Sequence, residues 1–385
     1  MAIETSCDDT GISILETKGV KNPSFNVLSN IVSSQIEVHK KYGGVYPMMA
    51  KREHQNNLVP TLEKALKTAD LPKISKKQIT NSQTDILKEI LNKESNLYEN
   101  LKRFLEKYEK PDVNLIAVTQ GPGLEPCLWA GVNFAKALSF FWNIPVVPIN
   151  HIESHILVNY LENKIINFPA ICLIVSGGHT QLILMKGIGK YKILGETRDD
   201  AAGECFDKAA KILGLGYPGG PIISKLASKN EKKESFMPRP MIGTKDYDFS
   251  FSGLKTAVLY HHKKQSVKTQ KSKEYIAKMC AEIQQAIIDV LIKKTIKVAK
   301  DYKTKTIILG GGVSANEELR KQLAEKIQKE IPACKFLFPK QELSTDNALM
   351  IAITGYFYKT KTKNWKNLEA KSNLRISKSI ISRNL

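Results

Sequence analysis

The two histidines of the segment His151-Ile-Glu-Ser-His155 are spaced so that both could bind one metal ion. Asn150 is a good N-cap residue, and the apolar residues that follow recur at helical spacing, which predicts a helix beginning at His151. Residues four apart share one helix face, so the two imidazoles can reach one divalent cation. Glu153 is two positions from each histidine, about 200° around the helix, and points away from that cation. It cannot be the water-activating base of an HExxH protease, so a carboxylate from elsewhere has to complete the site.

A candidate for that carboxylate stands near the C-terminus. Ser344, Thr345, Asp346 and Asn347 come directly before an apolar stretch, residues 348–357. Such a polar cluster predicts the N-cap of a helix, and this structural role alone would explain it. Asp346 is in addition the candidate third ligand of the metal. Without such a carboxylate, the histidine pair is better explained as two ordinary surface residues.

Two glycine-rich segments follow apolar strands and could bind a phosphate. The first, residues 176–180, reads SGGHT, and the second, residues 310–316, reads GGGVSAN. Glycine lets backbone N–H groups approach a phosphate, and Ser176 and Thr180 would add hydroxyl donors. A helix expected over residues 316–328 would point its N-terminus at the ligand. Neither segment matches the Walker A sequence or a dinucleotide-binding GxGxxG pattern.

Two pairs of acidic residues could act beside such a ligand. Asp8 and Asp9 occur in a turn-forming segment, residues 8–11, where carboxylates facing phosphates would hold a cation or steer a nucleophile. Glu204 and Asp207 are three apart and are neighbours on an expected helix. Acidic pairs of this kind commonly bind ribose or amino-acid groups. A solvated helix face is the alternative interpretation of the second pair.

The elements that must position these residues occur twice. Residues 2–16 and 171–186 each place two apolar runs around a small polar turn, which predicts a β-hairpin. Each hairpin is followed later by a strand, a glycine-rich turn and a helix, at residues 115–141 and 306–328. We therefore expect an internal duplication, with two α/β lobes and a ligand in the cleft between them. A large α/β protein with several unrelated hairpins is the alternative.

The expected boundaries follow from composition. An N-terminal lobe is expected over residues 1–145, a C-terminal lobe over 146–360 and a basic tail over 361–385. Residues 73–110 are rich in Lys, Asn and Glu and carry a modest helical stripe. This segment is therefore expected to be a solvated helical excursion from the first lobe.

The balance of charge points to a polyanionic partner. The chain has 385 residues, with 58 Lys and Arg against 38 Asp and Glu, a formal net charge of +20. Such a surplus favours nucleic acid or an anionic membrane, although it could serve solubility alone. No run of about 18 uncharged apolar residues occurs, so no transmembrane helix is expected. The six cysteines are scattered singly, which indicates reduced thiols in an intracellular compartment.

Taken together, the motifs resemble one family, the tRNA N6-adenosine threonylcarbamoyltransferases of the actin-like, sugar-kinase and heat-shock ATPase superfamily. The resemblance runs from Ile3 to about Gly355 and rests on these segments in combination: IETSCDDT at 3–10, GPG at 121–123, NHIESH at 150–155, SGGHT at 176–180, DDAAGECFDK at 199–208, YPGG at 217–220, FSFSGLK at 249–255, GGGVSAN at 310–316 and STDNA at 344–348. It implies two duplicated actin-like lobes of the ribonuclease-H type. No motif supplies the further tyrosine ligand of the archaeal and eukaryotic cytosolic members, so the chain resembles the bacterial and organellar branch.

The resemblance also implies roles for individual residues. His151, His155 and Asp346 would bind one divalent metal ion, Fe or Zn with Mg as the alternative, and Asp8 would contribute to the transfer. The adenylate ligand, threonylcarbamoyl-AMP or ATP and AMP, would be held by a longer set of residues: Ile174, Val175, Ser176, Gly177, Gly178, Glu204, Asp207, Gly220, Gly311, Gly312, Asn316, Ser344 and Thr345.

The implied reaction transfers a threonylcarbamoyl group from threonylcarbamoyl-AMP to N6 of the adenosine 3′ of the anticodon, in tRNAs that read A-starting codons. A separate synthase would supply the threonylcarbamoyl-AMP, and a homodimer is expected by analogy to the stand-alone organellar enzymes. Lys263, Lys264, Lys268, Lys271 and the basic tail are candidates for binding the tRNA. The abrupt start inside a strand and the basic charge favour a mitochondrial matrix protein whose targeting segment has been removed. The cytoplasm of a bacterium is the alternative.

Two other functions stay open at this point. A sugar kinase or carbamoyltransferase of the same fold would use ATP directly, but it has no evident need for the set His151, His155 and Asp346. A non-catalytic scaffold, switched by ATP or bound to nucleic acid, would need none of the three for catalysis.

Overall fold

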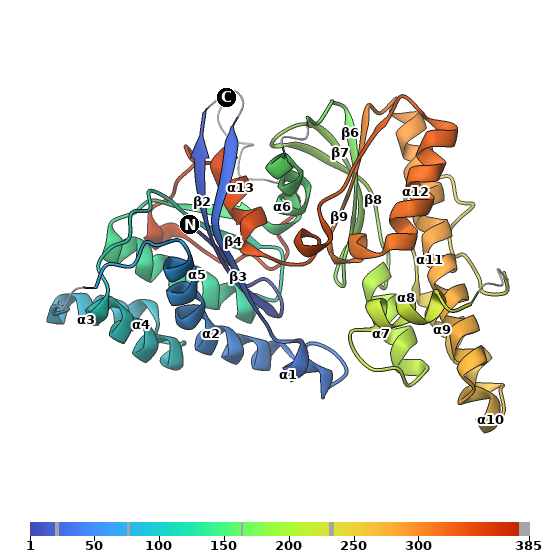
Figure 1. Ribbon diagram of the computed structural model, residues 1–385, viewed down its shortest axis with the longest axis horizontal. Coiled ribbons are helices and arrows are strands. Elements are labelled where there is room, and N and C mark those ends of the chain that lie inside the picture. Colours follow the sequence, from blue (N-terminus) through green and yellow to red (C-terminus); the bar gives the residue numbers. More distant parts are fainter. Residues whose placement is uncertain (20–22, 75–77, 163–164, 231–234, 377–385) are drawn as a thin grey trace. The chain divides into compact units, whose positions relative to one another are not determined.

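The chain divides into two compact units (Figure 1). This is a computed structural model that describes residues 1–19, 23–74, 78–162, 165–230 and 235–376. Unit 1 comprises residues 1–37, 45–163 and 346–385, and unit 2 comprises residues 38–44 and 164–345. The expected boundaries at residues 145 and 360 differ from these, because the chain enters unit 2 later and returns to unit 1 at residue 346.

A five-stranded sheet in the order β3-β2-β1-β4-β5 forms the centre of unit 1. β1 pairs antiparallel with β2 and parallel with β4, while β2 pairs antiparallel with β3 and β4 pairs parallel with β5. The strands are β1 (Ala2–Glu4), β2 (Asp9–Lys18), β3 (Ser24–Ser34), β4 (Ile116–Gly121) and β5 (Val146–Asn150). Because β5 completes this sheet, a boundary at residue 145 would cut through it.

Helices pack against the sheet of unit 1. α2 and α5 contact each other and the strands, and α13 contacts all five strands and α6. α13 reads ALMIAITGYF and is apolar on every side, as expected of a helix with no solvent-facing side. The helices of unit 1 are α2 (Pro47–Thr68), α3 (Asn81–Ile90), α4 (Ser95–Lys107), α5 (Glu125–Trp142), α6 (His151–Leu157) and α13 (Ala348–Phe357), with short 3₁₀ turns η1 (Val158–Glu162) and η4 (Trp365–Asn367). The short helix α1 (Ile36–Lys40) begins in unit 1 and ends in unit 2.

The sheet of unit 2 repeats that of unit 1. Its order is β10-β9-β6-β7-β8, with β6, β7 and β8 paired antiparallel and β6, β9 and β10 paired parallel. The strands are β6 (Ala170–Val175), β7 (Thr180–Gly187), β8 (Lys190–Glu196), β9 (Thr306–Gly310) and β10 (Lys335–Leu337). The strand order and the parallel or antiparallel direction of each pair are the same as in unit 1. The predicted duplication, and with it the α/β fold of two actin-like lobes, is confirmed.

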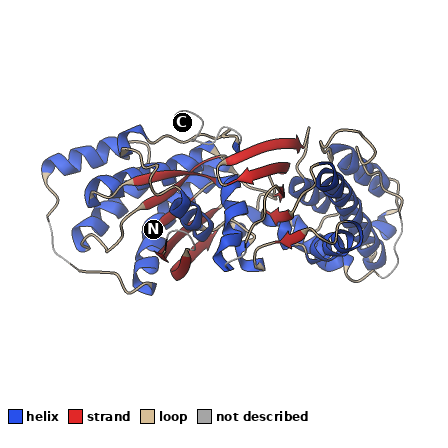
Figure 2. Ribbon diagram, turned by 90° about the horizontal axis from the view of Figure 1, so that it is seen from above, coloured by secondary structure: helices blue, strands red, loops and turns tan. Residues whose placement is uncertain are grey.

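Helices border the sheet of unit 2 as well (Figure 2). α11 is 29 residues long and packs on α8, α12 and β6. The helices are α7 (Ala202–Ile212), α8 (Gly219–Ala227), α9 (Ser252–Lys263), α10 (Val267–Gln270), α11 (Lys273–Asp301) and α12 (Glu317–Glu330), with 3₁₀ turns η2 (Gly312–Ala315) and η3 (Gln341–Leu343). The helix predicted over residues 316–328 is confirmed as α12. None of the helices in the described ranges is long and apolar enough to cross a membrane.

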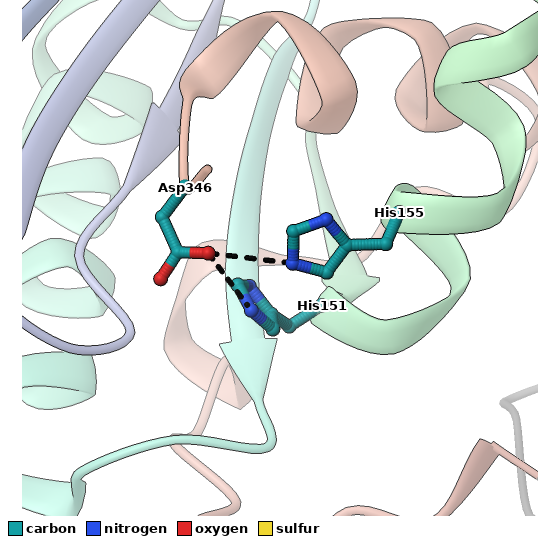
Figure 3. A group of neighbouring side chains, drawn as sticks. All are labelled: His151, His155 and Asp346. Atoms are coloured by element: carbon teal, nitrogen blue, oxygen red, sulfur yellow. Dashed lines mark ion pairs between the residues drawn. The ribbon is translucent and has the colours of Figure 1, made fainter. Parts of the chain in front are cut away.

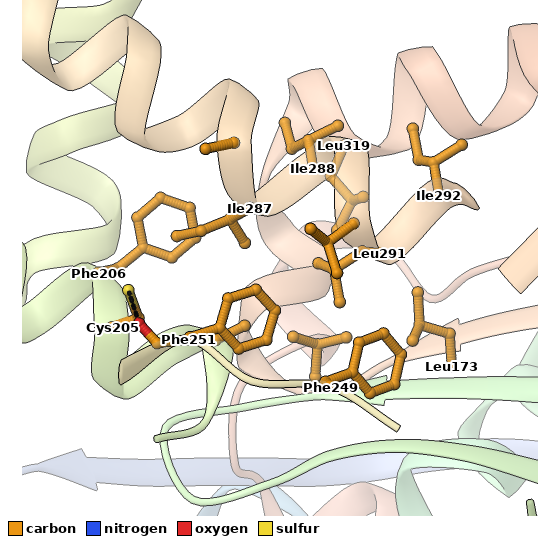
Figure 4. Close-up of a cluster of buried hydrophobic side chains, with 14 of the residues drawn as sticks. Leu173, Cys205, Phe206, Phe249, Phe251, Ile287, Ile288, Leu291, Ile292 and Leu319 are labelled. Carbon is orange, nitrogen blue, oxygen red and sulfur yellow. Dashed lines mark hydrogen bonds between the residues drawn. The ribbon is translucent and has the colours of Figure 1, made fainter. Parts of the chain in front are cut away.

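Each unit has its own hydrophobic core. In unit 2, Phe206, Phe249 and Phe251 pack with aliphatic residues of α11 such as Leu291 (Figure 4). The core of unit 1 gathers apolar residues from β1, β4, α2, α4 and α5. All six cysteines are free thiols, and five of them are buried, in agreement with the sequence-based expectation of reduced thiols.

The excursion over residues 73–110 is not solvated as expected. It forms two helices, α3 and α4, and Leu87, Leu97, Leu101 and Phe104 are buried in the core of unit 1. The prediction of a solvated segment was wrong, because the apolar residues of α3 and α4 pack on α5 and α2. Residues 75–77 lie outside the described residues.

The basic tail also packs onto unit 1 over its described part. Leu368 is buried in the core, and Lys363 forms an isolated bridge with Val146 of β5. Residues 377–385 of the expected tail lie outside the described residues. Up to residue 376, the segment that begins at residue 361 is therefore part of unit 1 and not a separate tail.

The turn of the first hairpin lies earlier than predicted. β1 ends at Glu4 and β2 begins at Asp9, so the connection is Thr5 to Asp8 and not the segment 8–11. Gly11 belongs to β2, where it pairs with both Glu4 and Val32. Asp8 is thus the last residue of the turn, whereas Asp9 is the first residue of a strand.

Candidate metal and adenylate sites

The three candidate metal ligands come together in unit 1. His151 and His155 lie on α6, and Asp346 stands directly before the N-cap residue of α13. As predicted, Asn150 caps α6 and Asn347 caps α13 through their side chains. Capping fixes where each helix begins, and so fixes the positions of the three ligands.

Close packing of α13 on β2 supports the position of Asp346. A Cβ placed on Gly11 would lie 2.9 Å from the backbone nitrogen of Ala348, which is the first residue of α13. The absence of a side chain at Gly11 therefore lets the start of α13 approach the strand.

Both imidazoles face one carboxylate oxygen (Figure 3). Oδ1 of Asp346 lies 3.4 Å from Nε2 of His151 and 3.3 Å from Nε2 of His155. The two rings meet edge to face, with centroids 4.7 Å apart. Both histidines are buried, whereas 22% of the Asp346 side chain is exposed. The structure thus brings the three candidate ligands together.

These residues fit a metal ion. A tetrahedral ion with bonds of about 2.0–2.1 Å has ligand atoms about 3.3–3.4 Å apart, which agrees with both distances to Asp346. Nε2 of His155 is buried and has no hydrogen-bond partner among the described residues, since its approach to Asp346 lacks hydrogen-bond geometry. Buried polar atoms are normally paired, so this nitrogen is suited to bind a cation. Two histidines and a carboxylate suit zinc or non-haem iron.

Glu4 holds His151 from behind. Nδ1 of His151 lies 3.3 Å from Oε2 of Glu4 and 3.2 Å from Oγ of Ser6. Glu4 is fully buried, and it also accepts hydrogen bonds from the Thr119 hydroxyl and from the Ser6 N–H. A carboxylate bound to one ring nitrogen fixes the tautomer that leaves the other nitrogen for the metal.

The same neighbours set the charges of the cluster. Burial opposes protonation of His151, but Asp346 and Glu4 outweigh it and raise the pKa of His151 to about 9. Burial, reinforced by the charge of His151, lowers the pKa of His155. Burial works against ionisation of Glu4, yet the adjacent His151 brings the pKa of Glu4 below its ordinary value. The two carboxylates therefore favour a positive charge at His151, which a proton or a bound cation can supply.

Glu153 does not join the cluster. Its carboxylate is buried and accepts a hydrogen bond from the Tyr358 hydroxyl. Burial and this carboxylate raise the pKa of Tyr358. The three residues that could share an ion are His151, His155 and Asp346, without Glu153. The prediction that this chain lacks the HExxH arrangement is confirmed.

The turn that carries Asp8 is supported by His54 of α2. Nε2 of His54 lies 3.0 Å from the carbonyl oxygen of Cys7, and its Nδ1 lies 2.7 Å from the Thr10 hydroxyl. Burial and the charge of Asp8 raise the pKa of Asp9 to about 7. The ionised form of Asp9 is therefore disfavoured beside Asp8, the residue predicted to act in the transfer.

In unit 2, the two glycine-rich loops leave the same edge of the sheet. β6 and β9 are parallel neighbours, with Ile174 paired to Gly310, and the loops follow directly. The start of α7 joins them, because the Gly203 N–H donates to the Ser176 carbonyl at 3.2 Å. Ligands of open α/β sheets bind at the carboxyl ends of the strands, which is the edge these loops occupy.

Three of the glycines border open space. A Cβ placed on Gly177, Gly178 or Gly312 would have no atom within 4 Å. Gly311 differs, since it has a φ of +85° and its Cβ would lie 2.5 Å from the Val175 carbonyl oxygen. The open glycines can admit a phosphate close to the backbone, whereas Gly311 serves the fold.

Four predicted ligand residues have buried side chains, Ile174, Val175, Thr180 and Ser344. The Thr180 hydroxyl accepts a hydrogen bond from the Ala202 N–H at 2.9 Å. Ser344 accepts one from Arg320 at 2.8 Å. The Thr180 hydroxyl therefore holds the start of α7, and it is fully buried, so it is not exposed to a ligand at the loop.

The two predicted acids of α7 have different partners. Asp207 accepts a hydrogen bond from the Gly219 N–H at 2.7 Å and so positions the turn before Gly220. Glu204 pairs with Lys208 at 2.8 Å and keeps 42% of its side chain exposed. Glu204 therefore keeps an accessible carboxylate, whereas a carboxylate oxygen of Asp207 is bound to the backbone.

Asn316 and Thr345 complete the predicted set. The Asn316 side chain caps α12 by accepting from the Leu319 N–H at 2.9 Å, and it donates to Gln284 at 2.8 Å. Thr345 is exposed, next to Asp346. Asn316 therefore has a structural role at the end of the second loop, whereas Thr345 is accessible to a ligand.

Comparison with known proteins decides the family. A family model described as tRNA N6-adenosine threonylcarbamoyltransferase matches residues 26–83 and 92–353. The chain belongs to this family. Relatives with that name occur in Thermosipho africanus, with 43% identity over 98% of this chain and 99% of the relative, and in Thermosipho melanesiensis, with 44% over 98% and 99%. Another, in Syntrophomonas wolfei, has 40% identity over 93% and 91%.

The match to the threonylcarbamoyltransferase family has one internal gap. Residues 84–91, which include most of α3, lie outside it, whereas all three metal-site residues and both glycine-rich loops lie inside it. Most of α3 is thus additional to the family pattern, in agreement with the lack of motifs in the excursion.

Sequence reasoning missed three residues that support the sites of this threonylcarbamoyltransferase, Glu4, His54 and Arg320. The sequence could have pointed to Glu4, because it is a lone charged residue at the end of a buried apolar strand. No such feature pointed to His54 or Arg320. Each acts on a residue 44 or 24 positions away, and no spacing rule connects such distant positions.

Proposed function

We propose that this chain transfers the threonylcarbamoyl group from threonylcarbamoyl-AMP to N6 of the adenosine 3′ of the anticodon, in tRNAs that read A-starting codons. The observation that carries the proposal is the family match, which includes the three candidate metal ligands and both glycine-rich loops, together with the relatives that align over 98% of this chain. In this reaction N6 forms a bond to the carbamoyl carbon, and the bond from that carbon to the AMP oxygen breaks. AMP leaves, and N6 loses a proton.

We propose that His151, His155 and Asp346 hold one divalent metal ion. Their distances, the buried Nε2 of His155 and the support from Glu4 favour this assignment. Two imidazoles favour iron or zinc over magnesium, which prefers oxygen ligands. When bound, such an ion supplies a Lewis acid for the mixed anhydride.

We further propose that the open loops of unit 2 bind the adenylate. The backbone at Gly177, Gly178 and Gly312 would surround the phosphate, and Glu204 would accept from the ribose hydroxyls. Asp207, Asn316 and Ser344 would position the loops, and Thr345 would contact the ligand. This division of roles follows from which side chains are exposed.

Asp8 is proposed to take the proton from N6. An adenine amine is a poor nucleophile, so alignment and a nearby carboxylate matter more than affinity. The contacts of His54 hold the turn in place, and Asp9, with its pKa of about 7, would limit the charge beside Asp8.

The remaining assignments concern partners and place. We propose that a separate synthase supplies threonylcarbamoyl-AMP and that the chain forms a homodimer, which sedimentation would test. The named relatives come from bacteria, which supports the bacterial cytoplasm and gives no support to the mitochondrial matrix.

The test is complementation. The chain is expressed in a bacterium depleted of its own threonylcarbamoyltransferase, and tRNA nucleosides are measured by mass spectrometry. We expect the modified adenosine to return with the wild-type chain and not with Asp8→Asn. No modified nucleoside from a well-expressed wild-type chain would contradict the proposal. Sugar-dependent ATP consumption by that chain would instead support the kinase alternative.

A further inference from the structure

The far end of unit 2 carries a dense group of lysines, which we call the basic tip. It comprises residues 260–278, from the end of α9 through α10 to the start of α11 (Figure 1). Its sequence contains six lysines and one acidic residue, Glu274. The tip is separate in the chain from every residue of the metal and adenylate sites.

The tip is an ordered structure. Gln270 donates to the carbonyl oxygen of His262 at 2.9 Å and to that of Gln265 at 3.2 Å, which ties α10 back onto α9. The Tyr275 ring stacks on His261 and His262, with centroids 6.1 and 5.7 Å away. These contacts join the three helices and so hold together the backbone that carries the lysines.

Five of these lysines are exposed and unpaired. No carboxylate of the described residues forms an ion pair with them; they are Lys263, Lys264, Lys268, Lys271 and Lys273. Some lysines elsewhere in unit 2 are paired, as Lys297 is with Asp301 and Lys300 with Glu330. The tip differs in density, because its five unpaired lysines fall within the eleven residues 263–273. Clustered like charges repel each other, so binding a polyanion would relieve this repulsion in the tip. A lysine that already pairs with a carboxylate gains less from such binding.

Exposed apolar groups accompany the charges. The Tyr260 side chain is 61% exposed and Val267 is 66% exposed, both among the lysines. An exposed ring beside cations can stack on an unpaired base, which is typical of surfaces that bind nucleic acid.

We propose that the basic tip binds the phosphate backbone of the tRNA substrate. The inference rests on the proposed function, which makes tRNA the polyanion that this chain must bind. Lysines on short helices contact phosphates without reading bases, so the tip would supply affinity and orientation and leave the choice of adenosine to the reaction site.

The experiment measures tRNA affinity against salt concentration. The variant Lys263→Gln, Lys264→Gln, Lys268→Gln and Lys271→Gln is compared with a control, Lys186→Gln, Lys190→Gln, Lys321→Gln and Lys329→Gln. The control removes the same charge from exposed lysines elsewhere in unit 2 that have no ion pair within the described residues. Each phosphate contact contributes about 0.9 to the slope of log affinity against log salt.

We expect the tip variant to lose about 2–4 units of that slope, and to bind tRNA at least about tenfold more weakly near 0.1 M salt. The control should change neither quantity by more than a small fraction of this. Replacing the same four tip lysines by arginine should keep wild-type binding. Equal losses in the tip variant and the control, or a wild-type slope in the tip variant, would overturn the proposal.

The result is separable from the proposed function. If the transfer assignment fails, the wild-type chain still shows tip-dependent tRNA binding but yields no modified nucleoside. If the tip assignment fails, the tip variant modifies tRNA with wild-type KM and salt dependence. Circular dichroism of each variant confirms that the exposed substitutions leave the fold intact.

Discussion

The two units share one sheet topology but expose different chemical groups at corresponding turns. The first hairpin turn of unit 1 ends in Asp8, whereas that of unit 2 carries Gly177 and Gly178. Unit 1 therefore presents carboxylates and imidazoles, and unit 2 presents exposed backbone. The same strand order can thus position side chains that act on a reacting group, or backbone donors that hold a phosphate.

The glycine-rich loops after the fourth strand differ in the same way. In unit 1, a Cβ on Gly121 would meet the carbonyl oxygen of Lys371, and the Gly123 N–H donates to the Ser372 carbonyl at 3.1 Å. The chain's own C-terminal segment fills this loop. In unit 2, the equivalent space beside Gly312 is open. A GPG or GGG motif alone therefore does not tell a ligand site from a packing site.

The largest effect should come from the metal cluster. We expect the double variant His151→Ala, His155→Ala to lower threonylcarbamoyl transfer more than about 100-fold. Loss of a residue that only hydrogen-bonds to a metal ligand already lowers metal affinity or activity about 10–100-fold. Bound metal, measured by elemental analysis, should fall from about one ion per chain to near zero, and a chelator should reproduce both losses. His261→Asn, on α9, is the control and should leave the metal content unchanged. Full metal content in the double variant would place the ligands elsewhere.

The filled loop of unit 1 should control stability. Gly121 has a φ of +151° and no room for a side chain, so Gly121→Ala should lower the free energy of unfolding by about 2–4 kcal/mol. The matched control is Gly312→Ala in the open loop of unit 2. Denaturant unfolding of both variants would measure the difference. Equal stability of the two would mean that the loops do not differ as described.

Glu4 should tune the cluster without belonging to it. Glu4→Gln keeps the shape but removes the charge behind His151, and should weaken metal affinity about 10–100-fold. Competition with a chromogenic chelator measures that affinity. Glu16→Gln, on the exposed end of β2, changes the same charge in the same sheet and should have no effect. Unchanged affinity in Glu4→Gln would show that His151 needs no orienting partner.

The sequence alone was enough to predict the duplication and to select three residues that the structure brings together. The hairpins and strand-turn-helix units are local patterns, so both lobes and the ends of α5, α12 and α13 could be predicted. His151 and His155 share a helix face, which is again a local property. Asp346 is 191 positions from His155, and it was found because an N-cap cluster and a family motif coincide there.

Long-range packing was beyond sequence reasoning. Burial of the excursion depends on how α3 and α4 meet α2 and α5, and the C-terminal segment over Gly121 depends on a contact across 250 residues. Thr180 shows the same limit, since a hydroxyl next to a glycine-rich turn fits a phosphate site by its position in the sequence. Only the tertiary structure shows that it is fully buried and accepts from the Ala202 N–H. Such contacts require the tertiary structure, because no local spacing encodes them.

The smallest effect should come from the open loop of unit 2, where chemistry and stability separate. Gly178→Ala meets no neighbouring atom, so the free energy of unfolding should change by less than about 0.5 kcal/mol. The added methyl group would still hinder close approach of a phosphate, and loss of one hydrogen bond to a charged group should weaken AMP binding about tenfold. Calorimetric titration with AMP measures this. Gly243→Ala is the matched control, since Gly243 is also open but lies outside both loops. If both variants bind AMP like wild type, the phosphate does not lie beside Gly178. The open loop of unit 2 would then not be a ligand-binding loop, and the proposed difference from the filled loop of unit 1 would be wrong.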